Sequence, residues 1–376
     1  MEIKAAVLNK VGMKKPYVDS KPLVIQKLDL GPPGQGEILI KIKAAGLCHS
    51  DLSVINGSRP RPTPMALGHE AAGIVMGLGN GVTRFSVGDH VVMVFVPSCG
   101  HCIPCAEGRP ALCEPGAQAN TAGTLLSGDR KLYLSGTPVN HHLGVSGFAD
   151  HAVVSEMSCV KIDPLLSFEE AALFGCAVIT GLGAVLNTAK VEPGASVAII
   201  GLGGVGLNSL LGAVMLGAKQ IVAIDLRSDK LDLARRLGAT HVFKAGDVGI
   251  DSRVRDVTDG GVDYAFEMAG SVAALALAWS ITSRGGQTVT SGLPHPDALF
   301  KLPAAQLVAE ERTLKGSYLG GCVPVRDIPI YIDLYQKGKL PVDKLMSDKI
   351  SLENINLAFD KLDSGETVRQ IIVFDE

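Results

Sequence analysis

A glycine-rich turn between an apolar strand and an apolar helix is the feature of this chain that most restricts its fold. The segment Gly201-Leu-Gly-Gly-Val-Gly206 follows a short apolar stretch at 196–200 and opens a helical pattern at 204–216. In a parallel α/β unit such glycines permit a tight turn, a close approach of the backbone to a pyrophosphate, and close packing of helix on strand. The pattern therefore predicts a doubly wound parallel sheet that binds a dinucleotide at the amino end of this helix.

An acidic residue completes this dinucleotide pattern. Asp225 ends the next apolar stretch, 220–225, where a carboxylate would bind the hydroxyls of the adenosine ribose. Such a carboxylate repels a 2′-phosphate, so we expect NAD in preference to NADP. Arg227 could shield the acid and allow some use of NADP, although a solvated loop arginine is the simpler interpretation. The residues that we place in the coenzyme site here are Gly201, Gly203, Gly204, Val205, Gly206, Asp225 and Lys230.

Four cysteines on one loop form a compact metal-binding motif. Cys99, Cys102 and Cys105 have C-x-x-C-x-x-C spacing, and Cys113 follows on the same loop. Four thiolates so close in sequence can converge on one zinc ion, and a zinc ion with four cysteine ligands is closed and structural. An iron–sulfur cluster is the alternative, although it usually has its own spacing. His101 lies inside the loop and could replace a thiolate, but with four cysteines present we expect it at the surface.

A second potential zinc site uses residues from distant segments. Cys48, His69 and Cys176 would leave a fourth coordination position open for water or substrate, which is typical of catalytic zinc. Each residue taken singly could belong to the core. Their neighbours favour a site, because a metal-bound histidine donates its second ring nitrogen to a carboxylate, and Asp51 is our candidate for that acceptor.

Composition restricts the class of partners. The formal net charge is −3 over 376 residues, without a basic run, which gives no reason to expect nucleic acid or an anionic membrane as a partner. The amino terminus lacks a secretory signal pattern, and no uninterrupted apolar run is long enough to span a bilayer, so we expect a cytoplasmic protein. In that reducing compartment disulfides are disfavoured, and the remaining Cys159 and Cys322 are expected to be buried thiols.

The order of secondary structure predicts an α/β protein with two kinds of domain. Short β-rich runs, interrupted by glycine and proline, are expected at 4–8, 37–44, 73–77, 90–95 and 151–162. A capping box at Ser167 to Glu170 opens a helix. Strands at 196–200, 220–225, 262–268 and 287–291 then alternate with helices at 204–216, 228–237 and 271–283. A helix at 328–337 and a strand at 368–374 are expected to rejoin the first domain.

These motifs resemble the zinc-dependent alcohol dehydrogenases of the medium-chain dehydrogenase/reductase superfamily, specifically the liver-like type. The resemblance extends over nearly the whole chain and includes Gly-His69-Glu70, the cysteine loop, Phe95-Val-Pro97, His141-His-Leu-Gly144, the glycine-rich turn and Gly365-Glu-Thr-Val-Arg369. It implies a GroES-like β-rich catalytic domain at 1–177 and 320–376, with a Rossmann coenzyme domain at 178–319. The long segment from Cys113 to His141 resembles a loop of dimeric members, so we expect a homodimer rather than a tetramer.

The resemblance also implies roles for individual residues. Cys48, His69 and Cys176 would hold catalytic zinc, and the cysteine loop a structural zinc, hence two zinc ions per subunit. Zinc lowers the pKa of a bound alcohol, and hydride then passes to the nicotinamide of NAD. Ser50 would accept the proton of the alcohol, Glu70 would lie behind the metal, and Asp51 completes the predicted catalytic residues. Thr180, Arg369 and His49 would contact the coenzyme.

Two positions depart from the family pattern. Ser53 stands where liver members have the histidine that ends the proton relay, and it cannot act as a base near neutral pH. His49 replaces a pyrophosphate-binding arginine, and a histidine is only partly charged near neutral pH, so looser coenzyme binding is expected.

The expected substrate is a small alcohol or aldehyde. The resemblance implies a pocket lined by Arg59, Phe95, His142, Leu293 and Tyr318. Arg59 falls where liver-type enzymes have an apolar residue, which motivates the hypothesis that alcohols carrying a carboxylate are accepted. A proline-stiffened surface loop with solvated arginines remains the simpler interpretation of the segment 57–64.

Two other functions remain open at this point. One is a polyol or hydroxymethyl-adduct dehydrogenase of the same superfamily, which the pocket loops would distinguish. The other is a non-catalytic nucleotide-binding redox sensor without zinc. The two complete ligand sets disfavour the sensor.

Overall fold

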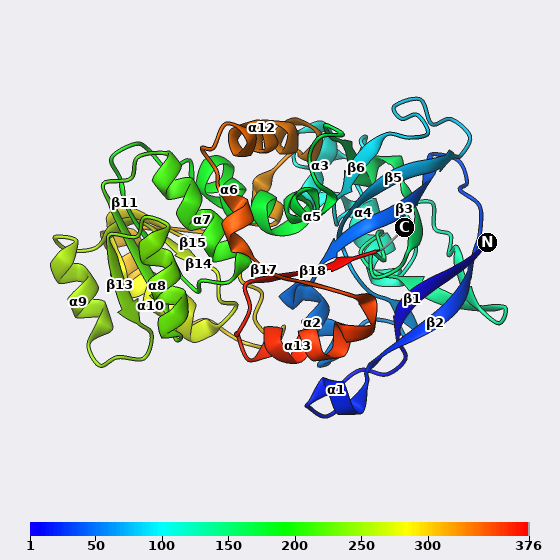
Figure 1. The fold of residues 1–376 in the computed structure, drawn as a ribbon. Helices are drawn as coiled ribbons and strands as arrows, with labels where there is room; N and C mark the ends of the chain where they lie inside the picture. Colours follow the sequence, from blue (N-terminus) through cyan, green and yellow to red (C-terminus); the bar gives the residue numbers. More distant parts are fainter. Residues whose placement is uncertain (375–376) are drawn as a thin grey trace. The chain divides into compact units, whose positions relative to one another are not determined.

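The computed structural model describes residues 1–374 and divides into two compact units (Figure 1). The first unit contains Met1–Cys176, Val323–Ile332 and Val342–Glu376, and the second contains Ala177–Cys322 and Asp333–Pro341. The boundaries expected from sequence were 1–177, 178–319 and 320–376, so residue 177 and the segments 320–322 and 333–341 fall in the other unit. Residues 320–322 pack there because the Cys322 thiol donates to the Ile179 carbonyl at 3.3 Å.

The first unit is built mainly from strands. A closed barrel has the order β1-β2-β7-β8-β4, and a sheet has the order β10-β6-β5-β3-β18-β17, with β9 also paired to β3. The barrel strands are β1 (Glu2–Leu8), β2 (Leu23–Leu30), β4 (Met65–Ala66), β7 (Leu132–Leu134) and β8 (Thr137–His141). The sheet strands are β3 (Glu37–Gly46), β5 (Glu70–Leu78), β6 (His90–Met93), β9 (His151–Ser155), β10 (Cys159–Lys161), β17 (Met346–Ile350) and β18 (Arg369–Val373).

Short helices connect these strands. They are α1 (Tyr17–Ser20), α2 (His49–Ile55), α3 (Ile103–Ala106), α4 (Glu114–Ala122), α5 (Phe168–Leu173) and α13 (Ile355–Asp363), with single turns at η1 (Pro110–Leu112), η2 (Glu156–Ser158), η6 (Val342–Leu345) and η7 (Leu352–Asn354). The main core lies under the larger sheet and includes Ile40, Leu47, Phe148 and Phe359, all of them fully buried. The carboxyl-terminal strand β18 pairs antiparallel with β3, so both ends of the chain contribute to one core (Figure 1).

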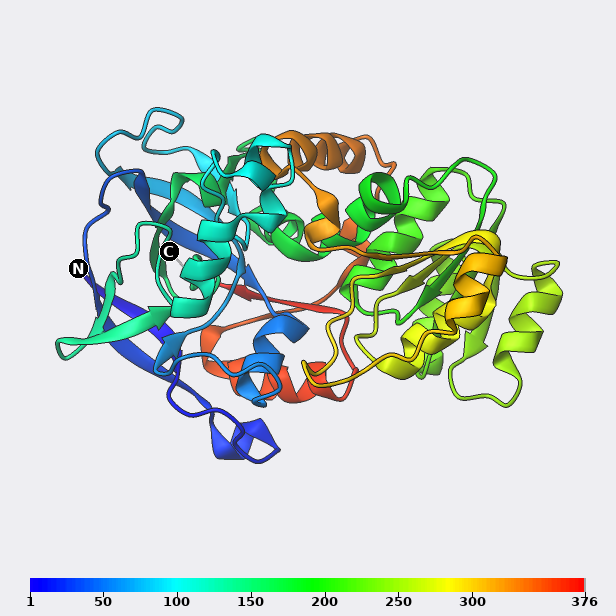
Figure 2. The same cartoon turned by 180° about the vertical axis from the view of Figure 1, so that it is seen from behind.

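The second unit is a six-stranded parallel sheet with helices on it (Figure 2). Its order is β13-β12-β11-β14-β15-β16, with β11 (Ser196–Ile200), β12 (Gln220–Asp225), β13 (His241–Lys244), β14 (Val262–Glu267), β15 (Thr282–Thr290) and β16 (Thr313–Gly316). Its helices are α6 (Ile179–Gly183), α7 (Gly204–Met215), α8 (Ser228–Arg236), α9 (Ile250–Val257), α10 (Val272–Ile281) and α11 (Ala304–Ala309), with turns η4 (Ala184–Ala189) and η5 (Leu319–Gly321).

The order of the strands reverses between β11 and β14, which are neighbours in the sheet but not in the chain. Alternate side chains of each strand point to opposite faces. Ala198 and Ile200 pack with the buried residues of α9 and α10 on one face. The sheet is therefore the doubly wound sheet expected from sequence, and ligands bind such sheets at the carboxyl ends of the strands beside the reversal.

Most elements agree with the sequence prediction, and the differences are local. β11 and β12 have the predicted bounds, and Ser167 caps α5 by accepting from the Glu170 amide at 3.3 Å. The strand expected at 151–162 is interrupted by the turn η2, because the Ser155 hydroxyl accepts from the Met157 amide and ends β9. α12 (Pro324–Gln336) begins four residues earlier than the predicted 328, and it crosses from the first unit to the second.

One helical stretch of the chain is long and largely apolar. Residues Phe168–Ala189, formed by α5, the π-helical η3 (Phe174–Val178), α6 and η4, are long and apolar enough to cross a membrane by length and composition, with a hydropathy of 1.7. Glu169, Glu170 and Thr180 lie within it, so it is not an uninterrupted apolar run. Of the 18 most apolar consecutive residues in this stretch, 83% are buried inside the protein, which is typical of a core helix.

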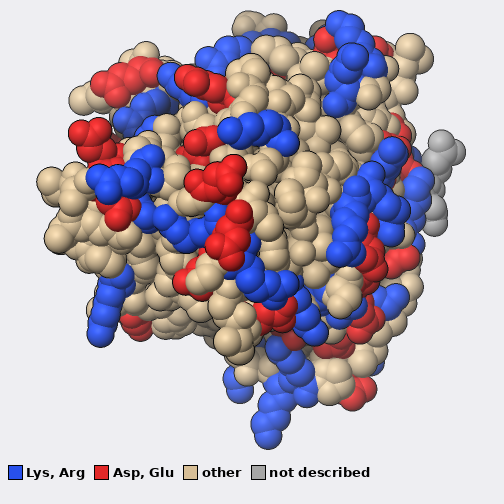
Figure 3. Space-filling model, turned by 90° about the vertical axis from the view of Figure 1, so that its left-hand side faces the viewer, with Lys and Arg blue, Asp and Glu red and all other residues tan. Residues whose placement is uncertain are grey.

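The surface drawn in Figure 3 carries acidic and basic side chains side by side. This face is the left-hand side of Figure 1, where α8 and α9 lie. The mixture of signs agrees with the small net charge of −3.

Candidate zinc and coenzyme sites

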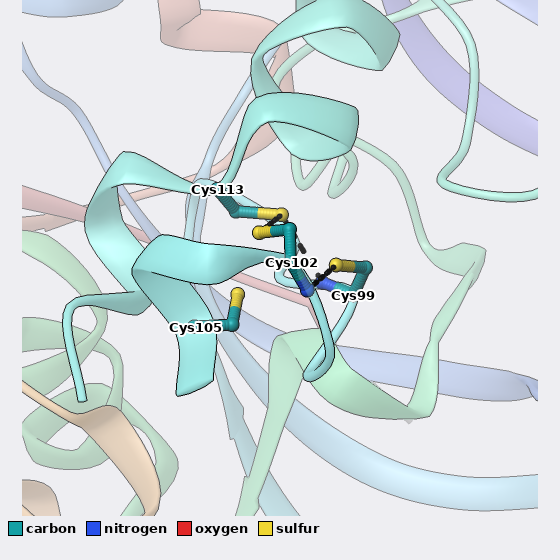
Figure 4. Close-up of side chains that lie close together, drawn as sticks. All are labelled: Cys99, Cys102, Cys105 and Cys113. Atoms are coloured by element: carbon teal, nitrogen blue, oxygen red, sulfur yellow. Dashed lines mark hydrogen bonds between the residues drawn. The ribbon is translucent and has the colours of Figure 1, made fainter. Parts of the chain in front are cut away.

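The four cysteines of the loop converge in the first unit (Figure 4). The sulfur atoms of Cys99, Cys102, Cys105 and Cys113 all lie within 4.8 Å of one another. Cys105 is placed by the short helix α3, and Cys113 caps the next helix, α4, where its sulfur accepts from the Gly116 amide at 3.3 Å. All four are free thiols rather than disulfides.

The donor set of this cluster fits a closed zinc site. Backbone amides point at the sulfur atoms, since the Cys99 amide donates to Cys113 at 3.2 Å and the Cys102 amide to Cys99 at 3.3 Å. Such amides stabilise negative charge on sulfur. A backbone amide beside Cys102 lowers the pKa of that thiol to about 6, whereas burial raises the pKa of Cys105 to about 12. Metal binding would require every thiol to lose its proton, so it would release protons here.

His101 lies outside this cluster. Its Nδ1 is 2.8 Å from the Cys99 carbonyl oxygen and the side chain is exposed. This agrees with the expectation that four thiolates suffice.

The three distant residues of the second set also come together, and all belong to the first unit. Potential ligand atoms of Cys48, His69, Glu70 and Cys176 lie within 4.8 Å of one another, and all four residues are buried. The two sulfur atoms are 4.0 Å apart. Strand pairing explains the proximity, because Gly46 of β3 lies opposite Glu70 of β5, which places Cys48 and His69 at the same end of the two strands.

The imidazole of His69 is oriented for metal binding. Its Nδ1 lies 3.1 Å from Asp51 Oδ1, the acceptor expected from sequence, and Asp51 also accepts from the Gly68 amide at 3.1 Å. Its Nε2 is buried without a hydrogen-bond partner. A buried ring nitrogen left without a partner costs free energy unless something binds it, so the residues fit a zinc ion at Nε2.

The two thiols of this set differ, because the hydrogen bond with Cys48 raises the pKa of the Cys176 thiol well above its ordinary value. A hydrogen bond from Cys176 lowers the pKa of the Cys48 thiol well below its ordinary value, and the positive charge of Arg369 adds to the effect. The thiolate is the form that ligates metals.

Glu70 and Arg369 form a buried ion pair behind this cluster. Arg369 Nη1 donates to Glu70 Oε2 at 3.2 Å and to the Leu47 carbonyl at 3.0 Å. Burial raises the pKa of Glu70 to about 8, and the guanidinium of Arg369 opposes the rise. The pairing joins residues 299 positions apart, so no local sequence pattern could have predicted it. Arg369 was expected to contact the coenzyme, and its side chain is 4% exposed.

The residues expected to move the proton lie on α2. Ser50 is half-buried, and its hydroxyl oxygen is 3.9 Å from Cys48 Sγ. Ser53, one turn later, donates to the carbonyl of His49 at 2.9 Å. This is the usual back-bonding of serine within a helix. His49 is the first residue of α2 and is exposed.

Two of the expected pocket residues flank His69. The ring of Phe95 lies 5.4 Å from the ring of His69, and that of His142 lies 5.6 Å from it, both edge to face. His142 Nδ1 is also 3.1 Å from Asp51 Oδ1, a contact that sequence reasoning missed. Burial lowers the pKa of His142, which favours a neutral ring beside the potential metal site.

The other pocket residues are less closely tied to the cluster. Arg59 is half-buried, and its amide donates to the Ser53 carbonyl at 2.8 Å. Leu293 and Tyr318 are exposed residues of the second unit, whereas Phe95, His142 and Arg59 belong to the first.

The glycine-rich turn has the geometry that the dinucleotide pattern requires. Gly201 has φ +93°, and a Cβ there would lie 2.7 Å from the Ala269 amide nitrogen. A Cβ at Gly206 would lie 1.9 Å from the Gly201 carbonyl oxygen. A Cβ at Gly203 would meet nothing within 4 Å, so this side of the turn is open. Gly204 and Val205 begin α7, whose amino end has no side-chain cap and thus leaves amides for an anion.

Asp225 ends β12 beside this turn. Its Oδ2 accepts from the Leu202 amide at 2.7 Å, and its Oδ1 from the Arg227 amide at 3.0 Å. The guanidinium of Arg227 donates to Asp229 at 3.0 and 3.1 Å. Lys230 is partly buried, and burial lowers its pKa.

Thr180 lies in α6, near the start of the second unit. It is 8% exposed, and its hydroxyl has no hydrogen-bond partner. An unpartnered buried hydroxyl is compatible with the coenzyme contact expected there.

Comparisons with known proteins show the family of this chain. Residues 34–164 match the alcohol dehydrogenase GroES-like domain, and residues 204–337 match the zinc-binding dehydrogenase family. A class-3 alcohol dehydrogenase of Drosophila melanogaster is 39% identical over 94% of this chain and 95% of its own. The chain belongs to the zinc-dependent alcohol dehydrogenases of the medium-chain dehydrogenase/reductase superfamily, which use zinc and NAD(P).

Two further proteins resemble this chain over nearly its whole length. An S-(hydroxymethyl)glutathione dehydrogenase of Escherichia coli O157:H7 is 38% identical over 95% of this chain and 97% of its own. The crystal structure of benzyl alcohol dehydrogenase from Acinetobacter calcoaceticus superposes with a TM-score of 0.93 at 34% identity, and the match covers 100% of both chains. These likenesses establish the expected fold, a GroES-like domain joined to a Rossmann domain.

We predict different consequences for loss of a ligand in the two zinc sites. Cys176→Ser should remove one zinc ion and abolish activity while the melting temperature changes little, because the open site supports chemistry. Cys102→Ser should lower the melting temperature first, because zinc bound by four cysteines contributes directly to folding free energy. Metal analysis, thermal melts and turnover of both variants test this division. Similar melting temperatures together with similar residual turnover in the two variants would contradict it.

Proposed function

We propose that this protein is an alcohol dehydrogenase that oxidises alcohols to aldehydes or ketones with NAD, and catalyses the reverse reduction. The observation that carries the proposal is the buried set of Cys48, His69 and Cys176 with a free His69 Nε2. The same chain holds the glycine-rich turn and Asp225 for the coenzyme. In the overall reaction the alcohol carbon gives a hydride to the nicotinamide, and the hydroxyl gives a proton to solvent.

The residues of the site have separate tasks in this proposal. Zinc, when bound by Cys48, His69 and Cys176, lowers the pKa of an alcohol hydroxyl and polarises a carbonyl. Asp51 holds the His69 ring through Nδ1, so that Nε2 is presented to the metal. Ser50 is the hydroxyl in position to accept the proton. Ser53 is engaged with the His49 carbonyl and is not a base, so the proton leaves toward solvent without a histidine at that position.

We propose NAD rather than NADP as the physiological coenzyme. The Asp225 carboxylate faces the turn that it hydrogen-bonds, and the nearest cationic side chain in sequence, Arg227, is bound to Asp229. Both observations support repulsion of a 2′-phosphate. We also assign one zinc ion to each site, hence two per subunit.

Oligomeric state and location belong to the same proposal. The edge strands of the six-stranded sheet, β13 and β16, each pair with one described strand, so a second subunit could extend the sheet at either edge. This supports a homodimer.

A cytoplasmic location is supported by the eight cysteines, all free thiols.

The proposal is tested by turnover of purified protein with a panel of primary, secondary and aromatic alcohols. NADH formation that is lost with a zinc chelator and restored by zinc is expected. The panel should include a polyol and the adduct of formaldehyde with glutathione, since a relative is named for that adduct and the adduct dehydrogenase is the main alternative. Absence of zinc together with weak NADH binding and no turnover would support the redox-sensor alternative instead.

Replacing Asp225 should change coenzyme preference. Asp225→Ser removes the carboxylate that repels a 2′-phosphate, so the ratio of kcat/KM for NAD to that for NADP should fall by about tenfold or more. Asp232→Ser is the matched control, since it removes a carboxylate of the same unit that pairs with Arg235 rather than with Arg227. An unchanged ratio for Asp225→Ser would show that this carboxylate does not face the ribose.

A separate prediction concerns Arg59 and the substrate. If Arg59 lines the pocket, ω-hydroxy acids should be better substrates than neutral alcohols of equal length, and Arg59→Leu should remove that preference. Arg84→Leu is the control, because the Arg84 guanidinium contacts the Met157 sulfur at 3.1 Å rather than an expected pocket residue. Specificity constants for the paired substrates provide the measurement. Equal effects on acids and neutral alcohols in Arg59→Leu would reject the hypothesis and leave the dehydrogenase activity standing.

A further inference from the structure

A buried carboxylate holds the end of β14 beside the glycine-rich turn. Glu267 is the last residue of this strand and is 1% exposed. Its Oε1 accepts from the amides of Ala269 at 2.8 Å and Gly270 at 2.6 Å, with a longer bond from Ser271 at 3.4 Å. A carboxylate that accepts several backbone amides forms charge-assisted hydrogen bonds, which are stronger than neutral ones. The turn 268–271 is therefore fixed from within by one side chain.

This turn is the surface on which the glycine-rich turn packs. A Cβ at Gly201 would lie 2.7 Å from the Ala269 amide nitrogen and 2.8 Å from its Cβ. A Cβ at Gly206 would lie 3.3 Å from the Met268 Cβ. The two turns are in such close contact that a shift of one displaces the other.

The second oxygen of Glu267 reaches the neighbouring strand. Its Oε2 accepts from the Thr290 hydroxyl at 2.7 Å, at the end of β15. The backbone beyond β15 also packs here, since a Cβ at Gly292 would lie 2.4 Å from Glu267 Oε2 and 2.4 Å from the Gly270 amide nitrogen. One carboxylate thus joins two strand ends at the carboxyl edge of the sheet, where ligands bind in this fold.

We propose that Glu267 is a positioning residue for the coenzyme, which sets the glycine-rich turn and the ends of β14 and β15 in the geometry that binds a dinucleotide. Glu267 acts through its neighbours and need not touch the coenzyme. The inference rests on the coenzyme site proposed above. It adds that the binding geometry depends on a side chain outside the glycine-rich pattern and the ribose-binding acid.

The same strand offers a matched control at its other end. Asp263, near the start of β14, accepts from the amide and the hydroxyl of Ser196, both at 2.8 Å. This carboxylate also joins two neighbouring strands, β14 and β11, but at the amino edge of the sheet. A purely structural role predicts similar consequences for loss of either carboxylate, whereas the positioning role predicts a difference in coenzyme binding.

The test compares NADH dissociation constants, measured by fluorescence titration of the zinc-loaded protein, with thermal melts of the same samples. In Glu267→Ala the dissociation constant should rise by about tenfold or more, the scale expected when charge-assisted hydrogen bonds are lost. Glu267→Gln keeps the shape and one acceptor oxygen, so it should recover most of the affinity. Asp263→Ala should lower the melting temperature and leave the dissociation constant unchanged.

Thr290→Val keeps the test decisive if Glu267→Ala does not fold. It removes only the hydroxyl that joins β15 to Glu267, and the dissociation constant should rise several-fold. Unchanged NADH binding in Thr290→Val, with Glu267→Ala unfolded or also unchanged, would overturn the proposal. Equal weakening in Asp263→Ala would overturn it as well. Failure of the proposed coenzyme function would be distinct, because the unmodified protein would then not bind NADH.

Discussion

The pairing of three strands, β5, β3 and β18, is the constraint on which the candidate catalytic site depends. Gly46 of β3 lies opposite both Glu70 of β5 and Ile371 of β18. This register sets Cys48, just beyond β3, beside His69, just before β5, and brings the start of β18 with Arg369 to the same edge. Gly46 has to lack a side chain, because a Cβ there would lie 2.9 Å from the Glu70 carboxyl carbon. A slip of one residue would turn alternate side chains to the wrong face and separate the ligands.

The third ligand of that site, Cys176, comes from the helical segment that leads out of the first unit. α5 packs against β3 and β5, and the chain continues through the π-helical turns that contain Cys176. Gly175 permits this approach, since a Cβ there would lie 2.4 Å from the Met93 carbonyl oxygen. π-helical turns occur frequently at functional sites. The position of Cys176 is thus fixed by helix-on-sheet packing, a different kind of contact from the strand pairing that sets Cys48 and His69.

Buried charge surrounds the site and is compensated group by group. Asp51 accepts a hydrogen bond from the Gly68 amide and faces the His69 ring. Glu70 forms an ion pair with Arg369. Removing one member of such a pair leaves an uncompensated buried charge, which is strongly destabilising. The second unit has a similar arrangement, because Glu267 and Asp225 accept hydrogen bonds from backbone amides at the carboxyl edge of its sheet. In both units, carboxylates hold the backbone that carries the functional groups.

The sequence by itself determined the local features of this protein. The cysteine loop, the strand–turn–helix from Ser196 to Met215 and the acid at Asp225 are each specified within a few turns of chain, because the contacts that stabilise them are short in sequence. The resemblance to a known family supplied the pairing of distant ligands, which spacing alone could not. Only the tertiary structure decided the partners of the buried groups. His142 beside Asp51, Arg369 on Glu70 and Thr290 on Glu267 join residues from different strands. Such contacts follow from sheet register and packing, which depend on the whole chain at once and leave no periodic signal in the sequence.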